Sequence, residues 1–133
     1  MPLIAVTRLR LRSLRHLPGF LWLTFRSRTQ ARRAPGHLET RLLKDAKLAF
    51  WTMSAWENEL AMRAYMVSGA HRTAMQWLKH VCDEAAIVHW LQESAELPDW
   101  LAAHRRMVAE GRPSNVRHPS PAHLAGVIAE PQL

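Results

Sequence analysis

The sequence places one histidine, His71, where a side chain able to do chemistry would face a buried surface. It follows a Ser-Gly-Ala break at residues 68–70 and stands in the first turn of a predicted helix. Met75, Leu78 and Cys82, spaced four, seven and eleven positions later, share its helical face, and a stripe this apolar must pack against a sheet. A neutral imidazole near pH 7 can bind iron or accept a proton. The alternative is a structural histidine whose ring hydrogen-bonds a backbone carbonyl.

We expect His71 to project into a cavity between the predicted helices and the sheet. The positive end of the helix dipole disfavours imidazolium there, so the ring should be neutral. Aromatic side chains nearby could line a pocket for a flat apolar substrate, although most tryptophans in a small protein pack in cores and subunit contacts. The candidates to line this pocket are Trp51, Thr52, Trp56, Tyr65 and Met75.

Length and composition predict one folded domain in a reducing compartment. With 133 residues, 48% of them hydrophobic, the chain can build a single core. Its one cysteine, Cys82, excludes an intramolecular disulfide and any multi-cysteine metal site, and it favours a cytoplasmic location. Because Cys82 lies on the apolar stripe, it should be a buried, unreactive thiol.

Four other histidines have no metal-ligand spacing, so we expect no metal site and solvated rings at His80, His104, His118 and His123.

The net charge of +7 is concentrated at the N-terminus. Residues 1–38 contain eight arginines and no acidic residue, whereas the remainder is nearly balanced. This segment, with its apolar run at 17–25, could be a targeting segment or a weak peripheral membrane anchor. The run is too short to span a bilayer, and no small-residue cleavage site follows it. Nucleic-acid binding is not expected, because the arginines lack the aromatic interleaving or recognition-helix pattern of such proteins.

The first half of the chain predicts three strands and a helix. Residues 3–12 alternate with period two, and one face of this strand becomes arginine-rich in its second half. That half should reach solvent or an acidic partner. A helix over residues 14–33 follows, and the strands over 37–43 and 48–53 should pair as an antiparallel hairpin.

The second half predicts three helices and a strand. Ser54-x-x-Glu57 matches a capping box, so we expect a helix to begin at Ser54. A further helix begins near residue 70, and a fourth strand covers residues 84–91. The last helix starts in the Leu-Pro-Asp-Trp segment at 97–100. Its predicted inner stripe is Leu101, His104 and Val108.

The order β-α-β-β-α-α-β-α predicts an α+β, ferredoxin-like split βαβ fold with an antiparallel four-stranded sheet and helices on one face. Both faces of the strands at 48–53 and 84–91 are apolar, so the uncovered face should be buried as well. Two sheets packed face to face would bury it, and we therefore expect a homodimer, a dimeric α+β barrel.

The domain should cover residues 1–118. An extended or disordered tail over 119–133 should add little to the core.

Three short segments resemble a known family. They are Phe-Trp-Thr-Met-Ser-Ala-Trp-Glu at 50–57, Ser-Gly-Ala-His-Arg at 68–72 and Thr-Ala-Met at 73–75. They are similar to a family in the dimeric α+β-barrel superfamily, which also holds antibiotic-biosynthesis monooxygenases, heme-degrading monooxygenases and, more loosely, spheroidene monooxygenase. The resemblance spans residues 3–118 and implies the dimeric α+β-barrel fold.

The resemblance has two different implications for heme. Alignment with the heme-degrading enzymes places Tyr65 where they have a tryptophan over the heme, and Met75 where they have the iron-binding histidine. Their asparagine in the first strand has no equivalent near Thr7. These departures argue against heme degradation of that type. His71, one helical turn before Met75, could still reach into the same cavity. The spheroidene monooxygenase branch, whose members resemble this chain in the Thr-x-Ser-x-Trp segment at 52–56, instead implies a heme-dependent oxidation.

Two classes of function follow. The first is a monooxygenase-like oxidoreductase that binds a small or elongated apolar substrate, with His71 as the catalytic residue and, where heme is used, the cofactor-binding residue. Such an enzyme uses either bound heme or no cofactor, in which case the carbanion of the substrate reacts directly with dioxygen. The second is a non-catalytic dimeric ligand-binding or interaction protein that uses the same cavity.

Overall fold

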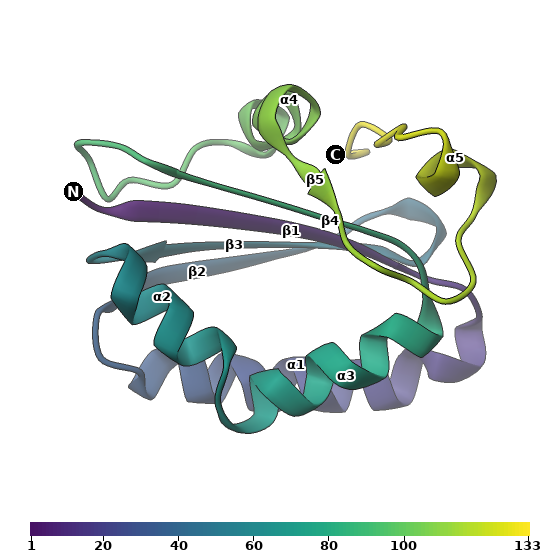
Figure 1. The fold of residues 1–133 in the computed structure, drawn as a ribbon, viewed down its shortest axis with the longest axis horizontal. Helices are drawn as coiled ribbons and strands as arrows, with labels where there is room; N and C mark the ends of the chain where they lie inside the picture. Colours follow the sequence, from purple (N-terminus) through teal and green to yellow (C-terminus); the bar gives the residue numbers. More distant parts are fainter.

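A five-stranded antiparallel sheet forms the central layer of the computed structural model, which describes residues 1–133 (Figure 1). The strands are β1 (Leu3–Leu11), β2 (His37–Lys44), β3 (Ala49–Trp56), β4 (Cys82–Leu91) and β5 (Arg112–Pro113). The helices are α1 (Leu17–Arg33), α2 (Glu59–Met66), α3 (Gly69–Val81), α4 (Trp100–Glu110) and α5 (Pro121–Leu124), with 3-10 turns at Leu14–His16 and Ala46–Leu48. The strand order is β2-β3-β1-β4-β5. Because β3 lies antiparallel between β1 and β2, the predicted split βαβ arrangement is confirmed.

The fifth strand is the part of the sheet that the sequence did not predict. β5 has two residues, which pair with Ala86 and Ile87 of β4. Two residues are too few to show the alternation that reveals a strand. The predicted sheet is therefore correct for β1 to β4 and incomplete at this edge.

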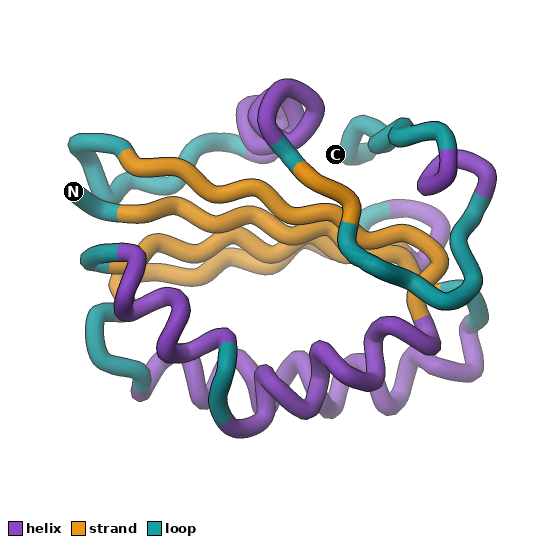
Figure 2. The backbone as a smooth tube through the Cα atoms, viewed as in Figure 1, coloured by secondary structure: helices purple, strands orange, loops and turns teal.

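Helical segments cover both faces of the sheet, in contrast to the prediction of one bare face. α1, α2 and α3 lie on one face, while α4 and the C-terminal segment lie on the other (Figures 1 and 2). The expected homodimer was inferred from a bare face, and the chain itself supplies much of that cover. Dimerisation therefore stays a prediction, which sedimentation at micromolar concentration would test.

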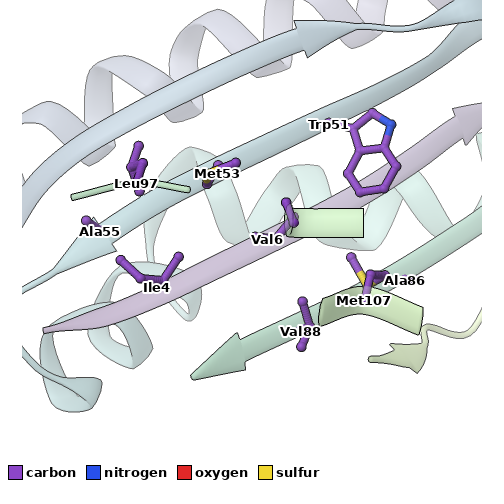
Figure 3. Packing of buried hydrophobic residues seen from close by; sticks show 10 residues of the cluster. Ile4, Val6, Trp51, Met53, Ala55, Ala86, Val88, Leu97 and Met107 are labelled. Carbon is purple, nitrogen blue, oxygen red and sulfur yellow. The ribbon is translucent and has the colours of Figure 1, made fainter. Parts of the chain in front are cut away.

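The largest hydrophobic cluster lies between the sheet and α4. β1 contributes Ile4 and Val6, whose side chains point to the same side as Trp51 and Met53 of β3 (Figure 3). From α4, Ala103 and Met107 are fully buried, whereas 62% of the Val108 surface is exposed. The predicted inner stripe of this helix is therefore wrong for two members, because Leu101 and Val108 lie outside the buried face. His104 is the member that turns inward, with its ring edge-on to Trp51.

The C-terminal segment is bound to the sheet rather than free. Ile128 packs against the large cluster, and its carbonyl accepts a hydrogen bond of 2.9 Å from Nε2 of His104. The backbone N–H of Gln132 donates to Oδ1 of the buried Asp45 at 2.9 Å. The expectation that residues 119–133 add little to the core did not include these contacts, and the contribution of the segment to stability stays a prediction. Isolated apolar residues in a segment without a periodic pattern gave no signal of these contacts.

A buried ion pair joins β1 to β4 under this segment. Nη1 of Arg8 lies 2.7 Å from Oε1 of Glu84, and both side chains are 6% exposed. Nη1 of Arg10 lies 2.9 Å from the other carboxylate oxygen, to which Ser120 also donates at 2.7 Å. The arginine-rich half of the first strand thus has an acidic partner within the same chain, one of the two environments expected for it.

The strand-to-helix junction lies later than predicted. β3 continues to Trp56, and α2 begins at Glu59 with Asn58 as its N-cap, whose Oδ1 accepts from the N–H of Ala61 at 2.9 Å. The predicted capping serine, Ser54, instead lies inside the strand and accepts a hydrogen bond of 2.9 Å from the Trp56 indole. Continued pairing with β1 and the burial of Trp56 outweigh the local capping signal.

No helix of the structure is both long enough and apolar enough to cross a membrane.

Replacement of Ser120 should show that the C-terminal segment stabilises the fold. Ser120→Ala removes a donor from a buried carboxylate, and we expect the free energy of unfolding to fall by about 1.5–3 kcal/mol. Urea denaturation followed by circular dichroism measures the change. Leu124→Ala in the same segment is the matched control, because 74% of the Leu124 surface is exposed and its loss should cost less than about 0.5 kcal/mol. Equal stability of Ser120→Ala and the unmodified chain would contradict this interpretation.

Candidate functional site

A cavity of about 200 Å³ lies between the inner face of the sheet and α1, α2 and α3. Its walls come from alternate residues of β1 and β3, such as Thr7 and Thr52, together with the inward side chains of the helices. Most of its lining is apolar. Alternation places every second residue of a strand on this face, so the walls follow directly from the register of the sheet.

The structure brings together five of the six side chains that the sequence assigned to this site. His71, Thr52, Trp56, Tyr65 and Met75 all line the cavity. Trp51 is the exception, and it lies in the cluster on the α4 side of the sheet (Figure 3). The correction follows from the geometry of a strand, because residues separated by an odd number of positions, as Trp51 and Trp56 are, point to opposite faces.

The ring of His71 is held in one orientation by the backbone. Its Nδ1 lies 3.1 Å from the carbonyl oxygen of Met66, which can only accept, so in the neutral ring the proton lies on Nδ1. Nε2 then carries the free lone pair. Burial lowers the pKa of His71, although the hydrogen bond to Met66 raises it in part. The structural and the chemical interpretations of His71 are therefore compatible, since the bond that fixes the ring also leaves a neutral base at the cavity.

Tyr65 lies between His71 and Trp56. The ring centroids are 4.5 Å apart for Tyr65 and His71, and 5.0 Å apart for Tyr65 and Trp56. The Tyr65 hydroxyl donates to the carbonyl of Ser27 in α1 at 3.0 Å, and burial raises the pKa of the phenol to about 12. Tyr65 is therefore protonated at neutral pH and cannot act as a base there. Its uncharged side chain forms part of the cavity lining.

Tyr65 also forms part of a second, open groove of about 1000 Å³ between α1 and α2. Phe25 and Arg26 lie in this groove on the α1 side, and Leu60 lies in it on the α2 side. Tyr65 is therefore a residue that the open groove and the inner cavity have in common.

Gln30 of α1 fixes the turn that carries His71, and sequence reasoning missed it. Its Oε1 accepts from the backbone N–H of His71 at 2.9 Å, while its Nε2 donates to the carbonyl of Ser68 at 2.8 Å. Gly69 lies against the same amide in a left-handed conformation with φ of 57°, and a Cβ there would lie 2.9 Å from Oε1 of Gln30. A glutamine on a helix that is 38 to 41 positions away in the sequence carries no local signal of this role.

The other candidate groups have structural roles or lie at the surface. Cys82 is fully buried, and burial raises the pKa of its thiol to about 12, as expected for an unreactive cysteine. Two histidines predicted to be solvated are bonded instead: His104 to the carbonyl of Ile128, and His123, whose Nδ1 accepts from the N–H of Ala85 at 3.4 Å. His80 and His118 are exposed. No group of three or more His, Cys, Asp or Glu side chains is arranged to hold a metal ion.

The cavity does not fit heme. Its volume of about 200 Å³ is below the range of roughly 300–1,000 Å³ of most small-molecule sites, and heme is larger than the ligands that many of those sites hold. His71 is therefore not assigned a heme-ligating role.

Comparison with known proteins confirms the resemblance noted from the sequence. Residues 20–77 match the family model described as antibiotic biosynthesis monooxygenase. This stretch runs from α1 to α3 and includes Gln30, Tyr65 and His71. No curated protein sequence matches the chain. The link to spheroidene monooxygenase stays a prediction.

Solved structures show the same fold. SnoaB from Streptomyces nogalater, described as a cofactor-independent oxygenase, superposes with a TM-score of 0.59 at 15% identity, covering 74% of this chain and 98% of its own. Rv0793 from Mycobacterium tuberculosis gives 0.64 at 12% identity, with 71% and 97% covered. PA3566 from Pseudomonas aeruginosa gives 0.61 at 13% identity, with 70% and 95% covered. At these identities the likeness establishes the fold alone.

Substitution of Gln30 should make the turn before α3 less ordered without creating a cavity in the hydrophobic core. In Gln30→Ala the N–H of His71 and the carbonyl of Ser68 lose their partner, so we expect the free energy of unfolding to fall by about 1–3 kcal/mol. The NMR signal of the His71 ring should also broaden or shift. The neighbouring Thr29→Ala, which loses only a hydrogen bond to its own helix, is the control. An unchanged His71 signal in Gln30→Ala would contradict a positioning role for Gln30.

Cys82 should not react with thiol reagents in the folded protein. A thiol with a pKa of about 12 that is closed off from solvent presents almost no thiolate at pH 8. Labelling with an aromatic disulfide reagent should therefore be at least 100-fold slower than in urea, where the one thiol should react completely. Rapid labelling under native conditions would show that the N-terminal end of β4, where Cys82 lies, opens to solvent.

Proposed function

We propose that this protein, which carries an antibiotic-biosynthesis-monooxygenase domain match over residues 20–77, is a monooxygenase-like oxidoreductase of the cofactor-independent kind. The observation that carries the proposal is the His71 ring, whose Nδ1 is bonded to a carbonyl and whose Nε2 is left as a neutral base at an apolar cavity. A base oriented by a second group is the usual arrangement for proton abstraction. The description of SnoaB as a cofactor-independent oxygenase supports the same class of chemistry.

The proposed substrate is a small, mostly apolar molecule with an acidic CH₂ group beside a carbonyl. A cavity of about 200 Å³ has room for a small molecule rather than an elongated one. Trp56, Met75 and Ile87 make much of the lining apolar, while Thr52 and Ser54 offer hydroxyl groups for a carbonyl oxygen. Exclusion of water from such a site strengthens each of these hydrogen bonds and protects a carbanion from the solvent.

The reaction needs no external electron donor. Nε2 of His71 accepts a proton from the CH₂ group, which leaves a carbanion delocalised onto the carbonyl as an enolate. The carbanion forms a C–O bond with dioxygen, and the proton returns from His71 to the distal oxygen to give a hydroperoxide. Loss of the second C–H proton then breaks the O–O bond, forming a ketone and water. The sum is R₂CH₂ + O₂ → R₂C=O + H₂O, in which the carbon is oxidised and dioxygen is fully reduced.

The first test separates proton abstraction from oxidation. Small 1,3-dicarbonyl and aryl ketone compounds are incubated with the protein in D₂O without oxygen, and deuterium exchange at the CH₂ group is followed by NMR. We expect His71→Ala to slow this exchange by about 10²–10⁴-fold, the usual contribution of a general base. His80→Ala, which changes an exposed histidine of the same helix, should leave it unchanged.

The outcomes distinguish the two classes of function. Oxygen consumption that matches ketone formation, and that is lost together with exchange in His71→Ala, would support the oxygenase. Ligand binding by NMR without any exchange in the unmodified protein would refute it in favour of a non-catalytic binding protein. A heme absorption band near 400 nm after addition of hemin, lost in His71→Ala, would refute the cofactor-independent mechanism.

The pH dependence of exchange should follow the lowered pKa of His71. Because burial lowers this pKa below the ordinary 6.5, the ring stays neutral through pH 7 and is protonated only in more acidic solution. We expect kcat/KM to fall as the pH is lowered, with an apparent pKa below the ordinary value of 6.5. A loss of activity centred above pH 7 would show that another group is the base.

A further inference from the structure

The outer face of α1 carries an apolar patch that the fold does not use. Leu21, Trp22 and Phe25 are 50%, 60% and 64% exposed, and the rings of Trp22 and Phe25 stack with centroids 6.4 Å apart. On the opposite side of the same helix, Phe20 and Ala31 are buried against the rest of the protein. Three adjacent large apolar side chains on a solvent-facing turn are unusual for a soluble surface and indicate a contact site.

Unpaired arginines surround this patch. Arg26 and Arg33 follow the aromatic pair along the exposed side of the helix, and Arg15 precedes it. The arginines that form ion pairs are Arg8, Arg10, Arg41, Arg63 and Arg106, and none lies between residues 12 and 33. Residues 1–38 contain no acidic residue. The guanidinium groups around the patch are therefore free to bind anions.

We propose that the outer face of α1 binds the surface of an anionic phospholipid bilayer. The helix would lie flat, with Trp22 and Phe25 inserted among the headgroups and Arg26 and Arg33 bound to lipid phosphates. Aromatic rings combined with basic residues on one helix are typical of interfacial binding, and tryptophan in particular prefers the headgroup region. Phosphate oxygens match the planar, bidentate donors of arginine.

The shape of the patch favours a bilayer over a protein or a nucleic acid. Leu21 and Trp22 project from the convex side of the helix, and Phe25 lies at the edge of the open groove between α1 and α2. The patch as a whole is therefore not a pocket shaped to receive a protein side chain. A nucleic acid would satisfy the arginines but would leave Leu21 in water. A fluid headgroup layer accommodates the projecting rings and the cations together.

Membrane binding would also make the open groove a route for substrate entry. This role of the groove rests on the proposed function, whereas the membrane binding does not. The groove between α1 and α2 includes Phe25 and Arg26 of the patch and ends at Tyr65, the wall of the inner cavity. A helix lying on the bilayer would place this groove beside the lipid, from which an apolar substrate could enter. The binding itself does not depend on any activity.

The experiment is flotation of the full-length protein with extruded vesicles, read by gel densitometry. Vesicles of phosphatidylcholine alone are compared with vesicles containing about 30% phosphatidylglycerol, at low salt and at about 0.5 M NaCl. We expect binding to the anionic vesicles only, weakened at high salt. Both Trp22→Ala/Phe25→Ala and Arg26→Glu/Arg33→Glu should reduce the partition coefficient by about tenfold or more.

The control variants lie on α4 and β5. Leu101→Ala/Val108→Ala removes exposed apolar groups of α4, and Arg105→Glu/Arg112→Glu reverses two exposed charges on α4 and β5 (Figure 1). Both should bind vesicles like the unmodified protein, and thermal melting checks that all variants fold.

Three results of the vesicle experiment would overturn the proposal. They are an absence of binding to anionic vesicles at low salt, equal losses in the control variants, and full binding by Trp22→Ala/Phe25→Ala. The last result would mean simple electrostatic adsorption rather than insertion of this patch. Preferential binding of an oligonucleotide in a competition with the vesicles would likewise reject the bilayer as the partner.

Discussion

The constraint on which the structure depends is that both faces of the sheet must be kept from water. Adjacent residues of β1 and β3 point to opposite faces, and both sets are largely apolar. Exposed apolar surface costs about 25 cal/mol per Å², so a two-sided sheet of this size requires two covering layers. α1, α2 and α3 provide one layer, and α4 with the C-terminal segment provides the other (Figure 2). The cover on the helix side is incomplete in the middle, and the gap there is the cavity that His71 lines.

Glu84 is a charged group buried between the sheet and its covering layer, so its carboxylate needs hydrogen bonds and ion pairs. Burial alone would raise the pKa of Glu84, but hydrogen bonds from Arg8 and Ser120 and the charges of Arg8 and Arg10 outweigh it and lower that pKa. A carboxylate with a lowered pKa adds stability above its unfolded pKa, and this contribution is lost as the pH falls through the folded value. The pair therefore stabilises the sheet at neutral pH. It also joins the C-terminal segment to the strands, because Ser120 is one of its members.

α1 connects the candidate site to the surface of the molecule. Its inner face contributes Leu23, Thr24 and Ser27 to the cavity, and its Gln30 holds the turn from which His71 projects. Its outer face presents the exposed aromatic pair and the unpaired arginines. One helix thus forms a wall of the site, fixes the position of the base and carries the surface at which we propose membrane contact. Bending or rotation of this helix would change all three together.

Periodicities of 2.0 and 3.6 residues are local properties of the chain, and they predicted β1 to β4, α1, α3 and α4, the split βαβ order and the cavity position of His71. The alternation within β3 also places Trp51 on the face opposite Thr52 and Trp56, so Trp51 does not belong to the cavity. The capping box at Ser54 was overruled because pairing with β1 and burial of Trp56 extend the strand. The partners of Gln30, Glu84 and Ile128 lie dozens of positions away in the chain. Only the tertiary structure decided these contacts, because packing between distant segments leaves no periodic pattern in either segment.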